Sequence, residues 1–132
     1  MRYLLDTNIL IYAYKNLGRC RIRIDAHEPQ NICICPLNVY ELDVGIAKSR
    51  HPQGMQLFLN DLQARFNQVA LTNEAASQAA KVRAKLEQQG LPIGPYDLLF
   101  AGIALAHDLT LVTRNTREFE RVPGLRIENW YD

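Results

Sequence analysis

The sequence predicts an α/β fold in which a mainly parallel, twisted sheet of four to five strands is flanked by helices. Short apolar runs of strand length alternate with longer segments in which apolar residues recur at helical spacing. Polar or acidic residues follow several of the apolar runs, and in parallel sheets the carboxyl ends of the strands are where binding sites form. With 132 residues the chain is long enough to bury one core, so we expect a single domain over residues 1–132.

The first strand-to-helix unit begins almost at residue 1. Residues 2–5 are expected to form an apolar strand, and Thr7 or Asn8 can cap a helix that continues to Ala13. The basic stretch that follows, residues 15–23, is expected to be irregular. Asp6 therefore lies at the corner between strand and helix.

The second unit combines a strand with two helices. Residues 31–35 predict a strand, and Pro36 begins a helix in which Glu41 lies beside an apolar stripe. The helical pattern breaks at residues 51–54 and resumes over residues 55–66. We expect an antiparallel helix pair whose apolar surface belongs to the core or faces a partner.

The last two units repeat the alternation. Residues 69–71 predict a strand, and a long amphipathic helix opens at Asn73 and ends before Gly90. Pro95 can begin the next helix, and residues 109–113 predict a further strand. Four strands in this order predict a parallel sheet with right-handed crossovers.

Three acidic residues stand among apolar neighbours that would normally enter a core: Asp6, Glu41 and Asp97. Ionised carboxylates are costly to bury alone, and several together repel one another, so such a cluster either shares protons or binds a cation. Magnesium takes oxygen ligands and needs only one or two protein carboxylates, with water and substrate phosphate oxygens completing its shell. The pattern therefore indicates a divalent metal site acting on a phosphodiester.

Composition sets limits on partners and compartment. The net charge of +1 means that any nucleic-acid binding comes from local basic patches and not from the overall field. No apolar run is long enough to span a membrane and no secretion signal is present, so we expect a cytoplasmic protein. Three cysteines without paired spacing, Cys20, Cys33 and Cys35, are expected to be buried free thiols rather than metal ligands or disulfides.

The ordered set of motifs resembles a PIN domain over essentially the whole chain. The resemblance is carried by Asp6-Thr7-Asn8 after the first strand and by four further segments, residues 41–42, 92–97, 111–119 and 121–130. The last of these is particularly similar to VapC toxins of bacterial type II toxin-antitoxin systems. The resemblance implies a metal-dependent ribonuclease (a hydrolase) with structured RNA, especially tRNA, as its substrate class and a VapB antitoxin as its inhibitor. It also implies a homodimer and a toxin-antitoxin hetero-oligomer, with magnesium or manganese as the ion.

The family's acidic positions match Asp6, Glu41 and Asp97. A fourth acidic position commonly follows the Thr-Arg pair after the last strand, where this sequence has Asn115, and Glu118 one helical turn later can supply the charge. The resulting hypothesis is that Asp6 and Asp97 hold the metal, whereas Glu41 and Glu118 orient the attacking water.

Other residues would support this chemistry. Thr7, Thr113 and Asn115 are expected to donate or accept hydrogen bonds around the metal-binding side chains. Arg114 and Arg117 are the basic residues expected to contact RNA phosphates, because they would lie near the acidic pocket.

Structural and functional alternatives remain open at this level. Asp6 alone reads as a helix cap, Asp97 as a carboxylate favoured by a helix dipole, and Glu118 as a member of an exposed ion network with neighbouring arginines. The function alternatives are a catalytically silent RNA- or protein-binding PIN module and an RNA-processing or DNA-directed nuclease of the same fold. A magnesium-binding signalling domain ranks last because no matching phosphoacceptor and lysine are evident.

Overall fold

The computed structural model describes all residues, 1–132, and its five strands form one sheet in the order β3-β2-β1-β4-β5. Every neighbouring pair of strands is parallel, with Tyr3 on β1 opposite Ile32 on β2 and Thr110 on β4. The predicted parallel α/β sheet is therefore confirmed. The strands are β1 (Tyr3–Leu5), β2 (Ile32–Ile34), β3 (Asn67–Gln68), β4 (Thr110–Val112) and β5 (Ile127–Glu128).

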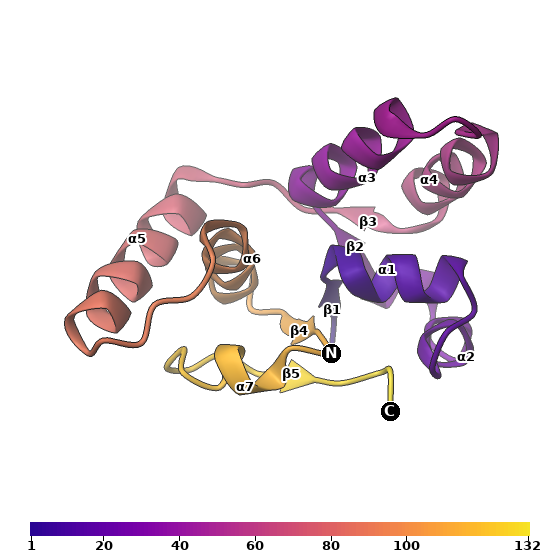
Figure 1. Ribbon diagram of the computed structural model, residues 1–132. Helices are drawn as coiled ribbons and strands as arrows, with labels where there is room; N and C mark the ends of the chain where they lie inside the picture. The colour runs from indigo at the N-terminus through magenta and orange to yellow at the C-terminus, as the bar shows by residue number, and fades with distance from the viewer.

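Helices cover both faces of this sheet (Figure 1). No helix is long and apolar enough to cross a membrane. A single 3₁₀ turn, Pro29–Asn31, precedes β2. The helices are α1 (Thr7–Tyr14), α2 (Cys20–Asp25), α3 (Pro36–Lys48), α4 (Gln53–Arg65), α5 (Asn73–Gln88), α6 (Pro95–Ala106) and α7 (Thr116–Phe119).

Alternation along the strands divides the core into two halves. Successive side chains of a strand point to opposite faces, so Leu4 joins the half packed against α5, α6 and α7, whereas Leu5 joins the half packed against α1, α2, α3 and α4. Leu111 and Val112 on β4 divide in the same way. Both faces of the central strands are thus buried, which explains why these strands read as continuous apolar runs.

Three elements differ from the sequence prediction. Residues 15–23, expected to be irregular, contain the start of α2, whose Cys20 and Ile24 are buried in the core. The strand expected at residues 69–71 lies two residues earlier, as β3, and Val69 continues it only through one bond from its N–H to the Ile34 carbonyl. The fifth strand, β5, pairs with β4, because tertiary pairing makes a strand of two residues that carry no periodic signal.

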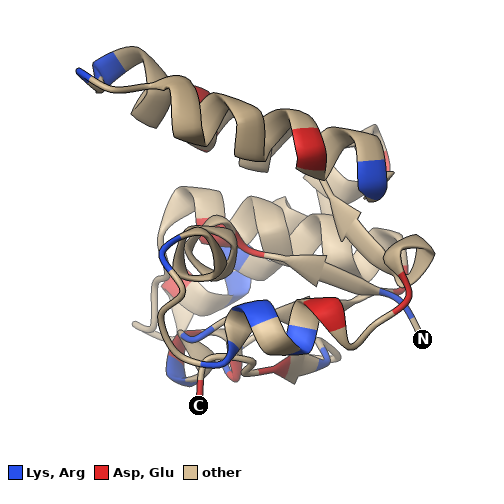
Figure 2. Ribbon diagram, turned by 90° about the vertical axis from the view of Figure 1, so that its right-hand side faces the viewer, with Lys and Arg blue, Asp and Glu red and all other residues tan.

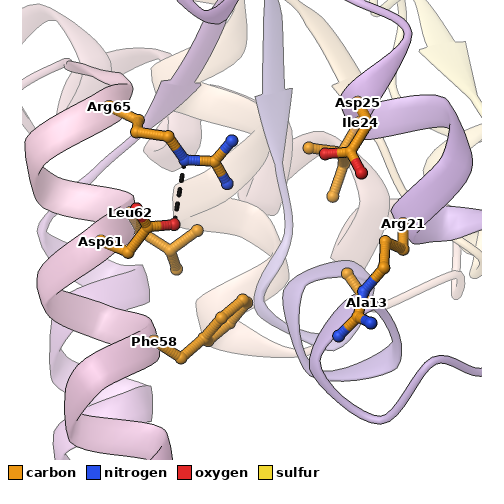
Figure 3. A pocket seen from close by; sticks show the side chains of 8 residues that line it. All are labelled: Ala13, Arg21, Ile24, Asp25, Phe58, Asp61, Leu62 and Arg65. Atoms are coloured by element: carbon orange, nitrogen blue, oxygen red, sulfur yellow. Dashed lines mark hydrogen bonds and ion pairs between the residues drawn. The ribbon is translucent and has the colours of Figure 1, made fainter.

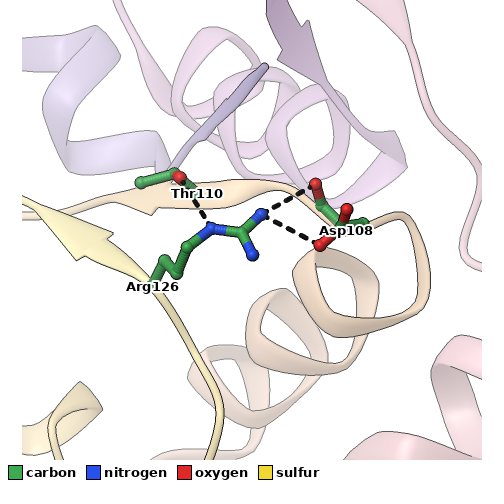
Figure 4. Close-up of polar contacts among 3 residues, drawn as sticks. All are labelled: Asp108, Thr110 and Arg126. Carbon is green, nitrogen blue, oxygen red and sulfur yellow. Dashed lines mark hydrogen bonds and ion pairs between the residues drawn. The ribbon is translucent and has the colours of Figure 1, made fainter. Parts of the chain in front are cut away.

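A side-chain contact fastens the segment before β5 to the turn between α6 and β4 (Figure 4). Arg126 donates from Nη2 to both the carboxylate and the carbonyl of Asp108, each at 3.0 Å, and from Nε to Thr110 Oγ1 at 3.4 Å. Asp108 has a positive φ of 55°, which Asp and Asn tolerate better than most residues. The ion pair is solvent-exposed, so it positions the edge strand more than it stabilises the fold.

The thiols and the surface charges agree with the composition. Cys20, Cys33 and Cys35 are all buried and unpaired, as predicted, and burial raises the pKa of each thiol. Basic and acidic residues are interspersed over the ribbon (Figure 2), consistent with the net charge of +1. Attraction of a polyanion must therefore come from particular side chains.

Helices α5 and α6 approach each other closely at Gly102. A Cβ atom built on the buried Gly102 would lie 2.8 Å from the Cβ of Ala79 and closer still to the carbonyl oxygen of Ala75. Since α6 carries Asp97 in its first turn, this contact also sets the position of an acidic side chain. Glycine at position 102 is therefore required by packing.

The first prediction is that Gly102→Ala lowers the free energy of unfolding by about 1–3 kcal/mol, because the added methyl group forces the two helices apart. Urea denaturation monitored by circular dichroism measures the change. The matched control is Gly45→Ala in α3, where a Cβ meets nothing within 4 Å; alanine there should raise stability by about 0.5–1 kcal/mol. Equal stability of the two variants would contradict the packing argument.

Candidate active site

The candidate site lies at the carboxyl ends of β1 and β4, where the strand order reverses direction. The chain runs from β1 outward through β2 to β3 and then returns to the other side of β1 as β4. In open parallel sheets such a reversal leaves a crevice that binds ligands. Asp6 follows β1 directly, and Thr113, Arg114 and Asn115 follow β4.

Asp6 caps α1 and is 8% exposed. Its Oδ1 accepts a hydrogen bond from the backbone N–H of Ile9 at 3.0 Å, so the prediction that Thr7 or Asn8 caps this helix was wrong. Burial raises the pKa of Asp6 to about 6, and the negative charges of Asp97 and Glu41 act in the same direction. Hydrogen bonds from the Thr113 hydroxyl and the Ile9 N–H oppose that rise without cancelling it. The Asp6 carboxylate thus caps the helix in a place where its ionised form is disfavoured.

A hydrogen-bond chain through the interior fixes Glu41. The Oγ1 of Thr7 donates to Glu41 Oε1 at 2.7 Å and accepts from Asn38 Nδ2 at 3.1 Å. Asn38 is fully buried; its Nδ2 also donates to the Leu5 carbonyl, and its Oδ1 accepts from the Cys35 N–H at the start of α3. This chain joins the end of β1 to α3 and directs the Glu41 carboxylate toward Asp6.

Asn38 is the residue that sequence reasoning missed. An amide three residues after the cap of a helix that begins with proline fits the capping box, in which this side chain bonds back to the cap N–H. That local signal was present. The bond from Asn38 to Thr7, 31 residues earlier, had no counterpart in the sequence.

Asp97 completes the acidic group. It is the third residue of α6, partly buried, and burial raises its pKa, as do the charges of Glu118 and Glu41. A small pocket of about 40 Å³, here called the acidic pocket, brings the three predicted acids together. Its lining consists of Asp6, Thr7, Asn8, Glu41, Asp97 and Phe100.

Glu118 lies at the margin of this group. Asn115 donates from Nδ2 to Glu118 Oε2 at 2.9 Å, while the Asn115 N–H donates to the Thr113 hydroxyl at 3.0 Å. Glu118 does not line the acidic pocket, although its charge reaches Asp97. The alternative in which Glu118 pairs with a neighbouring arginine does not occur, because the ion pairs of the structure are Arg65–Asp61, Arg83–Glu87 and Arg126–Asp108.

The two arginines expected near the acids occupy different places. Arg114 lines a second hollow of about 270 Å³ together with Asp6, Asn8, Tyr12 and Asn115. We call it the Arg114 hollow; it shares Asp6 and Asn8 with the acidic pocket. Arg117 is exposed on α7 and lines neither.

The donor set fits a magnesium ion, although the acids are not closed around a ready-made centre. No three His, Cys, Asp or Glu side chains converge closely enough to hold a metal by themselves. Magnesium retains several waters and needs only one or two carboxylates. Burial, and to a smaller degree the negative charges of Asp97 and Glu41, raise the pKa of Asp6, and a cation in the acidic pocket would favour its ionised form.

Other candidate features lie away from the acids. His27 stacks on Trp130 at 4.4 Å, and His107 contacts the Ala70 carbonyl through Nε2, so these two histidines have structural partners. A hollow of about 190 Å³ between α1, α2 and α4 (Figure 3) is lined by both apolar and charged side chains. Its residues are Ala13, Arg21, Ile24, Asp25, Phe58, Asp61, Leu62 and Arg65.

The sheet order and the acids at its point of reversal define a parallel α/β domain with an acidic site, and residues 3–125 match the family model described as "PIN domain". The chain belongs to the PIN-domain family. Within it, the chain is 37% identical over 131 residues to the tRNA(fMet)-specific endonuclease VapC of Shigella flexneri, with 98% of each chain covered.

Two solved structures extend the likeness to the fold. A VapBC2 complex of Rickettsia felis bound to promoter DNA contains a chain 35% identical to this one, with a TM-score of 0.89 over 98% of this chain and 99% of that chain. A DNA-bound VapBC of Salmonella typhimurium gives 36% identity and a TM-score of 0.89 over 98% of each chain. The chain is therefore a VapC-type ribonuclease toxin of the VapBC toxin-antitoxin class.

The second prediction concerns pH and the stability of the metal-free protein. Because the pKa of Asp6 is raised in the folded state, the fold binds this proton more tightly than the unfolded chain does between about pH 4 and 6. Stability is therefore lost as the pH rises through that window. Asp6→Asn keeps the cap acceptor but escapes the loss, so it should gain stability over wild type on the order of 3 kcal/mol between pH 4 and 7.

Thermal unfolding of both proteins across this pH range, with chelator present, measures the gain. Added magnesium serves as the control, since it should restore wild type at pH 7 and leave Asp6→Asn unchanged. A stability difference between the two proteins that stays constant with pH would show that the pKa of Asp6 is not raised in the folded state.

Proposed function

We propose that this ribonuclease is a metal-dependent endonuclease that hydrolyses phosphodiester bonds of tRNA and that a VapB-type antitoxin neutralises it. The observation that carries the proposal is the acidic pocket, in which Asp6, Glu41 and Asp97 meet from three separate elements. The substrate class is supported by the Shigella flexneri relative, whose name specifies tRNA(fMet).

Asp6 and Asp97 are the proposed metal-binding side chains, with Mg²⁺ as the expected ion and Mn²⁺ as its substitute. Both carboxylates have a raised pKa, and both line the acidic pocket. A bound divalent ion supplies Lewis-acid polarisation of the phosphate and neutralises its developing charge. Asp6 would hold the ion while it also caps α1 through Oδ1.

Glu41 and Glu118 are the proposed water-orienting groups. Thr7 holds Oε1 of Glu41, so the other carboxylate oxygen is available to accept a proton from the attacking water. Asn115 likewise holds Oε2 of Glu118. Each glutamate is fixed at one oxygen by a neutral donor, which orients it without removing its charge.

Thr113 and Asn115 are proposed to support the acids through hydrogen bonds. The buried Thr113 hydroxyl stabilises the ionised form of Asp6 and accepts from the Asn115 N–H. Thr7 does the same for Glu41. Asn115 brings no charge of its own, so the site holds one carboxylate fewer than it would with an aspartate at this position, which favours a single ion before RNA arrives.

The antitoxin is the proposed partner because two of the most similar solved structures are VapBC complexes. The hollow of Figure 3 is the proposed docking surface for part of the antitoxin, since it combines the apolar Phe58 and Ile24 with charges of both signs. Leu57, on the same helix α4 as Phe58, is 70% exposed and adds an apolar side chain to the surface of this helix. We also propose a homodimer within a toxin-antitoxin hetero-oligomer.

The third prediction tests the reaction itself. Purified wild type should cut a total bacterial tRNA pool into discrete fragments with magnesium or manganese and not with chelator, whereas Asp97→Asn should lose at least about a hundredfold in rate. Denaturing gels measure both. Asp108→Asn is the control, because Asp108 is exposed and Asn suits its positive φ.

Each outcome of that assay discriminates between functions. Equal cutting by wild type and Asp97→Asn would refute the carboxylate mechanism. An absence of cutting by wild type favours the silent binding module, and metal-dependent cutting of single-stranded DNA but not RNA favours the DNA-directed nuclease.

The fourth prediction concerns metal stoichiometry. Asn115→Asp adds a carboxylate next to Glu118 and should allow a second Mn²⁺ to bind without RNA, whereas we expect wild type to bind one. Isothermal titration calorimetry counts the ions. Asn115→Ala, which removes the amide without adding charge, is the control. One ion in all three proteins would refute the role assigned to this position.

A further inference from the structure

The Arg114 hollow differs from the acidic pocket in carrying a fixed positive charge. Its five lining residues include one carboxylate, two amides, one aromatic ring and the guanidinium of Arg114. Asp6 forms a wall common to both cavities. A ligand that bridges the two cavities would therefore meet the acids at one end and a cation at the other.

Aromatic rings hold the guanidinium in place. The Cζ atom of Arg114 lies 3.6 Å from the ring centroid of Tyr131 and 5.6 Å from that of Tyr12. The two rings contact each other edge to face, with centroids 4.8 Å apart. An arginine stacked on a ring keeps its N–H groups free for a bidentate contact with a phosphate.

The backbone on either side of Tyr131 is held in place by contacts of its neighbours Asn129, Trp130 and Asp132. Trp130 next to it is 1% exposed and belongs to the core, and Arg23 donates to the carbonyls of Asn129 and Asp132. The ring also packs on Gly18, where a Cβ would lie 2.7 Å from ring atoms. Tyr131 thus contacts both Gly18 and the guanidinium of Arg114.

The positive charge of Arg114 indicates which kind of ligand the Arg114 hollow suits. RNA carries one phosphate per nucleotide, and its approach to three carboxylates is repulsive unless a cation offsets them. Arg114 takes no part in any ion pair of the structure. It is therefore a cation in a hollow that opens beside the acids, with no carboxylate bound to it.

We propose that Arg114, held by the ring of Tyr131, binds an RNA phosphate neighbouring the one that is cleaved, so that residues 129–132 are part of the substrate site. Arg114 is the phosphate-binding residue and Tyr131 its positioning residue. This inference rests on the proposed ribonuclease function and names the part of the RNA backbone that the Arg114 hollow takes.

The test uses binding and cleavage of one probe, a labelled tRNA(fMet) transcript. Binding is measured by fluorescence anisotropy over a series of potassium chloride concentrations, in the Asp97→Asn background, which does not cut the probe. Arg114→Gln should weaken binding about tenfold, as expected for one lost charge-assisted contact. It should also lower the salt dependence by about one charge.

Variants of Tyr131 distinguish the positioning of Arg114 from the charge that Arg114 carries. Tyr131→Phe keeps the ring and should match wild type, whereas Tyr131→Ala should weaken binding in the same direction as Arg114→Gln with the salt slope retained. In the cleavage-competent background both weakened variants should raise KM with little change in kcat, because a neighbouring phosphate contact acts equally on ground and transition states. Arg83→Gln, an exposed arginine on α5, is the control for loss of one positive charge.

The failures of the two proposals are distinguishable. If wild type does not cut the transcript, the proposed substrate is wrong, and the anisotropy series still decides whether Arg114 binds RNA. If Arg114→Gln leaves the tRNA affinity and the salt slope of the Asp97→Asn protein unchanged, the inference is overturned. This holds even if the same substitution weakens binding of the antitoxin. A fall in kcat with KM unchanged would also overturn it. Arg114 is exposed, so its replacement by glutamine should leave the packing of the core unchanged.

Discussion

The structure depends on one electrostatic constraint, the burial of several acidic side chains close to one another at one edge of the sheet. Asp6 is held at the end of β1 by its own capping bond, and Glu41 is drawn to it by a chain through Thr7 and Asn38. Asp97 lies in the first turn of α6, and the contact of Gly102 with α5 sets the position of this helix. The fold therefore stabilises an arrangement that its own charges oppose, and a divalent cation is the simplest group that reverses the sign of that interaction.

Much of this arrangement follows from the sequence because it depends on local signals. A short apolar run that ends in Asp6 and the helix start at Pro95 before Asp97 both have recognisable patterns, and Glu41 lies beside an apolar stripe. The unpredicted parts depend on distant pairs. β5 exists only because β4 lies beside it, and the ring of Tyr131 reaches Arg114 and Tyr12 without any periodic signal. The buried role of Asn38 is intermediate, since its local cap was readable and its contact with Thr7 was not.

The two cavities on either side of Asp6 divide the work between charge types. The acidic pocket concentrates negative charge, which suits a cation, whereas the Arg114 hollow carries a positive group, which we propose binds the RNA backbone. Asn115 holds Glu118 by its amide and lines the Arg114 hollow, so it contacts both an acid and the hollow that carries the cation.

The measurement that tests the central claim most directly is the location of Mn²⁺ by anomalous scattering in crystals of the metal-soaked protein. We expect one strong peak in the acidic pocket, within bonding distance of the carboxylates of Asp6 and Asp97 and absent from crystals of Asp97→Asn. A peak elsewhere with an empty acidic pocket, or a pocket that holds no manganese at saturating concentration, would contradict the claim that these carboxylates are gathered to bind a cation.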